Sequence, residues 1–237
     1  MNQQAPEKQQ LRGDGLLAVH SIFYTIQGEG PFAGETAVFV RLAGCNLQCP
    51  LCDTDYTSDR RMVGPMGLVE LVDAVVEQAG GKTKLVVITG GEPFRQNITP
   101  AVQALLDSER FVQIETNGTL YLEGFPYDKV TIVCSPKAGA INPRLAEKMD
   151  WVKDAYKYVL RCAEIGVDGL PTLALAHPAS PQVARPPAGF KGRVFLQPCD
   201  EGKGNYANLE NLAACVDSVL KHGYTLGIQI HKLIGKE

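Results

Sequence analysis

The sequence lacks three features that would direct the chain into a membrane, into a secretory pathway or onto a nucleic acid. No apolar run reaches the roughly 20 residues that a membrane-spanning helix needs. Residues 1–15 are polar and contain no hydrophobic stretch typical of a signal peptide, so we expect a disordered N-terminal tail. The 23 basic and 26 acidic residues give a net charge of -3, which argues against a groove for tRNA or DNA. We therefore expect neither a membrane nor a nucleic acid as a partner.

A disulfide framework is also missing, because the seven cysteines are odd in number and only three are clustered. This usage is typical of a reducing compartment, and we expect a cytoplasmic protein. The scattered cysteines lie in apolar or strand-like segments and are interpreted as plain thiols: Cys134, Cys162, Cys199 and Cys215. The length of 237 residues suits a single α/β domain, which we assign to residues 16–237.

The three clustered cysteines, Cys45, Cys49 and Cys52, follow a probable strand at C-x3-C-x2-C spacing, so one turn can direct three sulfur atoms at one point. A cubane iron–sulfur cluster normally takes four thiolates, and three would leave one iron open to a small molecule. Structural zinc needs a fourth protein ligand, and no Cys or His follows within about twenty residues. A disulfide, or a set of buried apolar thiols, fits less well with the odd count and with the loop-forming residues Asn46, Gln48, Pro50 and Asp53.

Short apolar runs rich in β-branched residues recur along the chain and alternate with loops or helical patterns. Such runs are typical of parallel strands that are buried on both faces. The predicted strands are Leu17–Thr25, Val38–Leu42, Leu85–Thr89, Val112–Glu115, Val130–Cys134, Tyr156–Leu160, Val194–Gln197 and Thr225–Ile230.

Two segments place apolar residues at helical spacing: residues 68–79, and a stripe formed by Leu209, Leu212, Ala213, Val216, Val219 and Leu220. The pattern predicts an α/β fold, a partial (β/α)6 barrel with mostly parallel strands. Residues 161–192 contain five prolines and no sustained period, so we expect a loop or an insertion in place of a crossover helix. A lid over the site is the alternative for this segment.

Polar residues follow the ends of several predicted strands, where open α/β sheets bind their ligands. Gly90, Gly91 and Glu92 end one strand; the glycines permit close backbone approach, and Glu92 could accept from an ammonium group. The next strands end in further candidates: Thr116, Asn117, Ser135, Lys137 and Gln197. Lys137 suits a carboxylate, and Gln197 could bind adenine or ribose. Read singly, each of these segments is also an ordinary turn or cap.

The N-terminal strand ends in Gln27-Gly28-Glu29, whose two polar side chains can face one side of an extended chain. Together they complement an amide and a guanidine-like edge. Arg41, four residues before Cys45, can form a bidentate contact with a carboxylate, and His231 could bind substrate or transfer a proton. The alternatives are turn residues, a surface ion pair and an exposed terminal histidine.

The cysteine loop and Gly90-Gly91-Glu92-Pro93 resemble the radical S-adenosylmethionine (SAM) superfamily, with Leu51 where an aromatic residue is more usual. That resemblance implies a [4Fe-4S] cluster on Cys45, Cys49 and Cys52, and SAM binding by Leu51, Gly90, Gly91, Glu92, Thr116, Asn117, Ser135, Lys137 and Gln197.

Residues 19 to 233 resemble the 7-carboxy-7-deazaguanine synthase family, through Phe23–Gly30, the loop around Cys45, Glu115–Gly118, Ser135–Lys137 and Gln229–Lys232. The chain departs from that family in the Pro-rich segment, at Ile230 and in the six residues after His231. The resemblance implies ring contraction of 6-carboxy-5,6,7,8-tetrahydropterin to 7-carboxy-7-deazaguanine with loss of ammonia, a step towards queuosine. It further implies Mg²⁺ at Thr54, a flavodoxin or ferredoxin as electron donor, a homodimer, and substrate contacts from Gln27, Gly28, Glu29, Arg41, Gly91 and His231.

Two other classes of protein remain open at this point. An activase of glycyl-radical enzymes would also be small and SAM-dependent, but it needs a wide groove for a protein backbone. The clamp formed by Gln27, Glu29 and Arg41 argues against it. A noncatalytic electron-transfer or zinc module is the third class.

Overall fold

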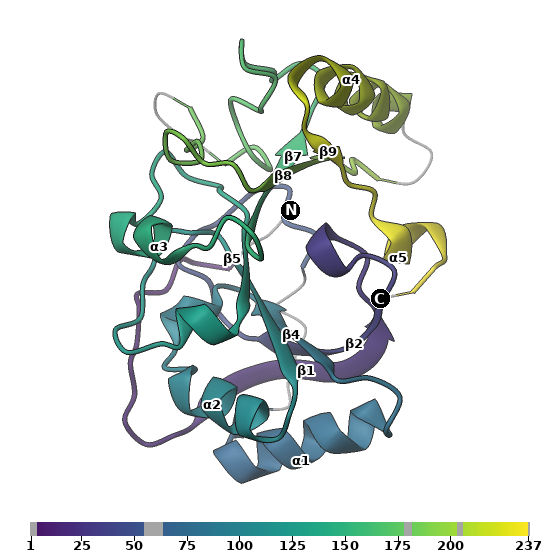
Figure 1. The fold of residues 1–237 in the computed structure, drawn as a ribbon. Coiled ribbons are helices and arrows are strands. Elements are labelled where there is room, and N and C mark those ends of the chain that lie inside the picture. Colours follow the sequence, from purple (N-terminus) through teal and green to yellow (C-terminus); the bar gives the residue numbers. More distant parts are fainter. Residues whose placement is uncertain (1–3, 55–63, 178–181, 203–205, 237) are drawn as a thin grey trace.

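The computed structural model describes residues 4–54, 64–177, 182–202 and 206–236, and within them the chain forms one curved sheet (Figure 1). The strands lie in the order β3-β1-β2-β4-β5-β6-β7-β8-β9. β1 is antiparallel to both of its neighbours, and every pairing from β2 to β9 is parallel. The strand bounds are Leu17–Ile26 (β1), Thr36–Leu42 (β2), Gly64–Met66 (β3), Leu85–Gly90 (β4), Phe111–Thr116 (β5), Thr131–Cys134 (β6), Ala155–Leu160 (β7), Arg193–Pro198 (β8) and Thr225–Leu226 (β9).

This open, mostly parallel sheet confirms the predicted partial barrel. Its six longer parallel strands are β2 and β4 to β8, and β9 adds only two residues. The sequence pattern missed β3, and it extended β9 too far. The Gly227 N–H still donates to Leu196 O of β8, and the chain then leaves the sheet for a short helix that begins at Ile230.

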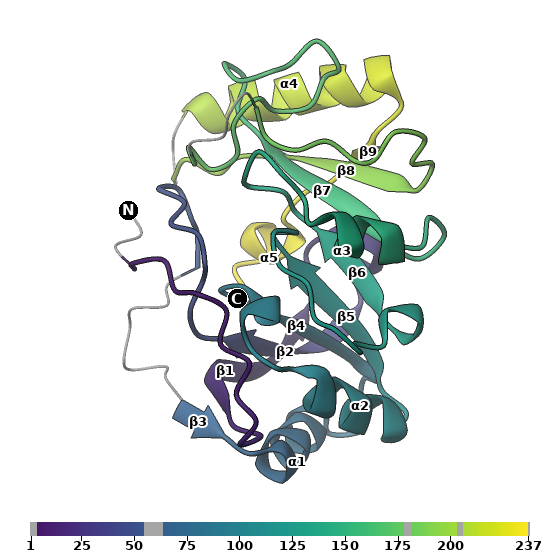
Figure 2. The ribbon, with the colours of Figure 1, turned by 90° about the vertical axis from the view of Figure 1, so that its left-hand side faces the viewer.

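The helices are Leu68–Ala79 (α1), Thr99–Asp107 (α2), Pro143–Lys148 (α3), Tyr206–His222 (α4) and Ile230–Leu233 (α5). Figure 2 shows α1, α2 and α4 outside the curve of the sheet and α5 inside it, near the C-terminal end. The stripe predicted for residues 68–79 is confirmed, since α1 buries Leu71, Val75 and Ala79. The concave side of the sheet is therefore left open for a site.

The apolar stripe predicted for α4 is only partly correct, because Val219 packs against the core while other members of the stripe are exposed. Leu209 and Leu220 are 64% and 80% exposed, whereas Asn211, Cys215 and Ser218 are buried. The physical reason is hydrogen bonding. The Asn211 side chain accepts from the Cys162 N–H and donates to Cys199 O, and the Ser218 hydroxyl donates to Gly169 O. The backbone of the loops after β7 and β8 forms hydrogen bonds with these polar side chains of α4, and Leu209 and Leu220 are left exposed.

Of the tail predicted for residues 1–15, residues 1–3 lie outside the described residues, and residues 4–15 form hydrogen bonds with the rest of the chain. The Glu7 N–H donates to Cys45 O at 2.8 Å, and the Gln10 N–H donates to Arg95 O at 2.7 Å. The Gln9 side chain donates to Phe94 O at 2.8 Å. These bonds seat the segment beside the cysteine loop. The described residues of the Pro-rich segment, 161–177 and 182–192, contain no helix. None of the helices formed by described residues combines the length and apolar character that crossing a bilayer requires.

Candidate active site

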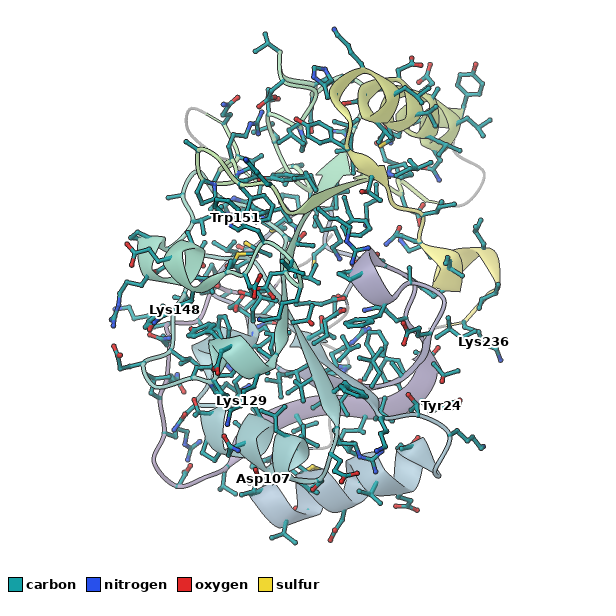
Figure 3. All side chains as sticks on the ribbon, viewed as in Figure 1. Tyr24, Asp107, Lys129, Lys148, Trp151 and Lys236 are labelled. Atoms are coloured by element: carbon teal, nitrogen blue, oxygen red, sulfur yellow. The ribbon has the colours of Figure 1, made fainter. Side chains whose placement is uncertain are left out.

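A cavity of about 490 Å³ opens at the carboxyl ends of the parallel strands, inside the curve of the sheet. It is lined by nine of the residues predicted from the sequence: Gln27, Glu29, Arg41, Leu51, Thr54, Ser135, Lys137, Gln197 and His231. Lys236, labelled in Figure 3 near the C-terminal end, also lines it. The other predicted residues do not line this cavity: Gly28, Gly90, Gly91, Glu92, Thr116, Asn117, Cys45, Cys49 and Cys52.

The interior of the barrel divides into an apolar floor and a polar upper layer. In β2, Val38, Val40 and Leu42 pack in the main core under the helices, whereas Phe39 joins a separate inner cluster and stacks on Phe23 at 5.5 Å. At the next inward-facing position along the strands, two residues further on, the side chains are polar. They are Arg41 (β2), Thr89 (β4), Glu115 (β5), Lys157 (β7) and Gln197 (β8). The alternation of the strands thus places a ring of charged and hydrogen-bonding groups above a closed base.

The cysteine loop is fixed to the end of β4 by backbone contacts. The Gly91 N–H donates to Leu42 O and the Glu92 N–H donates to Gly44 O, both at 3.0 Å. A Cβ atom on Gly91 would lie 1.7 Å from Gly44 O, and one on Gly90 would lie 2.2 Å from Leu42 O. The close backbone approach predicted for these glycines is therefore made to residues 42–44, which immediately precede Cys45.

Arg95 supports the same loop from below and is nearly buried. Its Nη2 donates to Ala43 O at 2.9 Å, and its Nη1 pairs with the Glu7 carboxylate at 2.8 Å. Gly44 has a φ of 83°, and a Cβ atom there would lie 2.3 Å from the guanidinium. Only glycine fits both the left-handed backbone and the contact with Arg95. The N-terminal segment and Arg95 together hold the start of the cysteine loop.

The three cysteines lie in one short loop and are candidate ligands of an iron–sulfur cluster. Burial is the main effect that raises the pKa of Cys45 to about 12, with smaller contributions from the charges of Glu92, Cys49 and Cys52. Among the described residues, no three His, Cys, Asp or Glu side chains form a group that could hold one metal ion. A cubane takes its thiolates at separate corners, so the three cysteines of this loop could supply three of its ligands.

Glu92 links the ends of β4 and β5. Its carboxylate accepts from the Thr116 hydroxyl (2.7 Å), the Asn117 N–H (2.7 Å) and the Phe94 N–H (3.0 Å). Burial raises its pKa to about 7, against the opposing effect of these hydrogen bonds. Thr116 and Asn117 thus meet Glu92 instead of the cavity, and the Asn117 amide donates to the Asn46 side chain of the cysteine loop at 2.9 Å.

Lys137 is a half-buried cation at the cavity wall. Its Nζ donates to the backbone O of Ser135 at 2.9 Å and also bonds the Ser135 hydroxyl. Burial lowers the pKa of Lys137, and the nearby Lys157 lowers it further. Because both effects disfavour its charged form, an anionic ligand beside Lys137 would be strongly stabilised.

Gln27 is buried, and its side chain is used within the protein. Its Oε1 accepts from the Glu29 N–H at 3.0 Å, and its Nε2 donates to Glu115 at 3.0 Å. Glu115 also accepts from Gln113 and Thr89. The sequence reading did not select Glu115 as a ligand, although it begins the Glu-Thr-Asn-Gly segment. Its position at the end of a strand, two residues after Gln113, is the signal that could have identified it.

Glu29 lies at the centre of a second network. Its Oε2 pairs with Lys157, and its Oε1 accepts from Gln229 at 2.7 Å and from Gln197 at 3.2 Å. Burial would raise the pKa of Glu29, but the Lys157 charge and these hydrogen bonds outweigh it and lower the pKa. Lys157 and Gln229 were not predicted. A lysine in an otherwise apolar strand was the available signal, because lysine is rarely buried without a partner.

Arg41 faces the cavity with unused donor capacity. Its guanidinium carbon lies 5.5 Å from the centre of the Phe23 ring, and its buried Nε has no hydrogen-bond partner among the described residues. His231 lines the cavity from α5 and packs so closely on Gly28 that a Cβ atom there would lie 2.0 Å from Nδ1. Because Gly28 has no side chain, His231 can reach the cavity wall.

Three comparisons with known proteins agree with this geometry. A family model described as the radical SAM superfamily matches residues 40–168. A 7-carboxy-7-deazaguanine synthase from Rhodospirillum rubrum is 43% identical over 233 residues, which cover 94% of this chain and 94% of that protein. One from Rickettsia prowazekii is 37% identical, covering 98% of this chain and 94% of that protein.

Among solved structures, the crystal structure of QueE from Escherichia coli matches with a TM-score of 0.65 and 22% identity. It covers 92% of this chain and 95% of that chain, and the likeness concerns the fold. The superfamily match implies a [4Fe-4S] cluster and SAM as cofactors. On the strength of the near full-length relatives, this chain belongs to the 7-carboxy-7-deazaguanine synthase family of the radical SAM superfamily.

Proposed function

We propose that this chain converts 6-carboxy-5,6,7,8-tetrahydropterin to 7-carboxy-7-deazaguanine with release of ammonia. The observation that carries the proposal is the content of one cavity. It places the guanidinium of Arg41, suited to a carboxylate, in the same space as the carboxylate of Glu29, suited to a guanidine-like edge. Leu51 and Thr54 of the cysteine loop line that space as well. Relatives named for this activity cover nearly the whole chain.

We assign the cluster to Cys45, Cys49 and Cys52, and SAM to the adjoining residues. When bound, the cluster and SAM supply the one-electron chemistry that begins with removal of a hydrogen atom from the substrate. Lys137 would receive the carboxylate of the methionine part, while Gln197, Ser135 and Leu51 contribute from the cavity wall. Gly90, Gly91, Glu92, Thr116 and Asn117 would shape this site by joining the ends of β4 and β5 to the cysteine loop.

In the substrate part of the cavity, Glu29 and Arg41 would bind the two ends of the pterin. Gln27 would act indirectly, by orienting Glu115 and Glu29 through its hydrogen bonds. Gly28 would also act indirectly, because its lack of a side chain leaves room for His231. His231 would close the side of the cavity that α5 forms. The apolar floor under these groups excludes water from below, which protects a radical reaction from unwanted hydrogen donors.

We further propose that Mg²⁺ binds at Thr54. Thr54 and Asp53 both line the cavity, and a hydroxyl next to a carboxylate suits a hard cation that retains water ligands. A preparation depleted of divalent metal should lose activity and regain it with Mg²⁺. Activity that is indifferent to both treatments would contradict this assignment.

We also infer the partners and setting that the family suggests: a flavodoxin or ferredoxin as electron donor, a homodimer and a cytoplasmic location. The apolar outer face of α4, formed by Tyr206, Leu209, Ala213, Val216 and Leu220, supports the homodimer. Its residues recur every three or four positions on both sides of the small Ala213, so that a second copy could pack antiparallel on the same face.

The decisive test is anaerobic reconstitution followed by incubation with carboxytetrahydropterin, SAM and a reductant. We expect a product with a deazapurine chromophore and one ammonia per turnover. A protein that retains four irons and binds SAM but forms no deazapurine would contradict the proposal. Formation of a glycyl radical on a partner enzyme would then favour the activase alternative.

A further inference from the structure

Lys157 is a buried cation that pairs with Glu29, and none of the substrate or cofactor contacts proposed above involves it. It lies in β7, whose six residues Ala155–Leu160 are all buried, and its side chain enters the cavity from the inner face of the sheet. The neighbouring residues Tyr156 and Tyr158 point the other way, into the main core. Removing an ammonium group from water costs several kcal/mol unless a partner compensates. A lysine at this position therefore requires an explanation.

Its direct partner is Glu29, whose Oε2 has one partner and whose Oε1 has two. Lys157 contacts Oε2, while Gln229 and Gln197 donate to Oε1. Burial alone would lower the pKa of Lys157, but the charges of Glu29 and Glu115 outweigh it and raise the pKa well above the usual value. The two groups therefore meet the substrate as a carboxylate and an ammonium group side by side at the cavity wall.

This pairing matches the chemistry of one edge of a pterin. The 2-amino-4-oxo edge presents two N–H donors followed by a carbonyl acceptor. A carboxylate can accept from both donors, but it repels the carbonyl oxygen. An ammonium group next to the carboxylate supplies the missing donor for that oxygen. Oε2 of Glu29 keeps an acceptor site beside Lys157, and a pterin N–H group would take the place of a glutamine donor at Oε1. The pair then offers acceptor, acceptor and donor in the order that the edge requires.

We propose that Lys157 is a specificity-determining residue that donates a hydrogen bond to the 4-oxo group of the pterin while Glu29 accepts from the neighbouring N–H groups. This inference rests on the proposed function and adds to it the basis for choosing 4-oxo over 4-amino pteridines. A 4-amino group would direct its own N–H donors at the ammonium group, so the same lysine that favours the oxo form rejects the amino form.

A purely structural role makes a different prediction. If Lys157 served only to neutralise the buried Glu29, its loss would weaken the binding of every pteridine alike. A role in reading the 4-oxo group changes the ratio of two affinities instead. The ratio is therefore the quantity to measure.

The experiment compares two stable ligands, 2-amino-4-oxopteridine-6-carboxylate and 2,4-diaminopteridine-6-carboxylate. Their dissociation constants are measured by equilibrium dialysis against the reconstituted protein with SAM and without reductant, so that no turnover occurs. The variants are Lys157→Met, Lys157→Arg and, as a matched control, Lys232→Met. Lys232 is another cavity-lining lysine, but it pairs with Asp53 and Asp200 and not with Glu29.

We expect the wild-type protein to prefer the 4-oxo ligand by about tenfold or more, as for a hydrogen bond from a charged donor. Lys157→Met should reduce this preference to within about threefold, whereas Lys157→Arg and Lys232→Met should keep most of it. If Lys157→Met does not fold, the double variant Glu29→Gln/Lys157→Met removes both buried charges and should likewise show a preference within about threefold.

A preference in Lys157→Met, or in the double variant, equal to that of the wild-type protein would overturn the inference, and so would a wild-type protein without any preference. Both results leave the proposed function intact. A wild-type protein that binds neither pteridine would instead contradict the proposed function itself.

Discussion

Gly91→Ala tests whether the glycines after β4 serve the cysteine loop. The new Cβ atom would lie 1.7 Å from Gly44 O, whereas real contacts of Cβ atoms essentially never fall under 3.0 Å. Either the strand end or the loop must therefore move by more than about 1 Å. Such a shift breaks the bonds from the Gly91 N–H to Leu42 O and from the Glu92 N–H to Gly44 O.

The loss of two backbone hydrogen bonds and the overpacking together should lower the free energy of unfolding by about 2–5 kcal/mol. The displaced loop should also hold less than half of the wild-type iron after reconstitution. Urea unfolding followed by circular dichroism measures the first quantity, and colorimetric iron analysis measures the second.

Gly13→Ala is the matched control. A Cβ atom on Gly13 meets nothing within 4 Å, so its stability and iron content should remain close to those of the wild-type protein. If Gly91→Ala behaves like Gly13→Ala in both measurements, the close approach of the two backbones does not seat the cysteine loop, and the account given for Gly90 and Gly91 fails.

Three further predictions concern other parts of the molecule. Arg41→Ala should raise KM for the carboxylated pterin about 10- to 100-fold with little change in thermal stability, because among the described residues the guanidinium contacts only the Phe23 ring. An unchanged KM in steady-state assays would remove Arg41 from the site. Leu220→Lys should shift the protein toward monomer in light scattering if α4 forms the homodimer contact, whereas Val69→Lys on the outer face of α1 should not. Glu92 has a folded pKa of about 7, above its unfolded value, so the folded state binds the extra proton and stability should fall as pH rises through that window. Between about pH 5.5 and about pH 8 the loss should be on the order of 2 kcal/mol, and Glu92→Gln should abolish this part of the pH dependence of urea unfolding; an unaltered profile would show that Glu92 does not titrate there.

Much of the local chemistry of the site could be predicted from the sequence alone. All eight predicted strands form, because short β-branched runs suit a sheet that is buried on both faces. The cysteine spacing indicated a shared ligand, and Ser135, Lys137 and Gln197 line the cavity because the carboxyl ends of parallel strands meet at one edge. Gln27 and Glu29 reach the same cavity from the end of β1, which runs antiparallel to β2.

Contacts between distant segments were not readable in the same way. The face of α4 that is buried depends on Asn211 and Ser218 meeting loop carbonyls and amides, which no helical period records. The seating of Glu7 beside Cys45 depends on a buried arginine more than eighty positions later in the chain. Both outcomes follow from the need to satisfy buried polar groups, and that need is known only when the chain is folded.

The sequence by itself therefore determined the kind of sheet, the cysteine triplet and most of the residue types that the chemistry needs, since these depend on local periodicity and spacing. The tertiary structure alone decided which of those residues reach the cavity, that Gly90 and Gly91 approach the cysteine loop, and that Lys157 stands beside Glu29. The physical reason is that side chains 128 positions apart can share a charge pair only after β7 has been placed across the barrel from the end of β1.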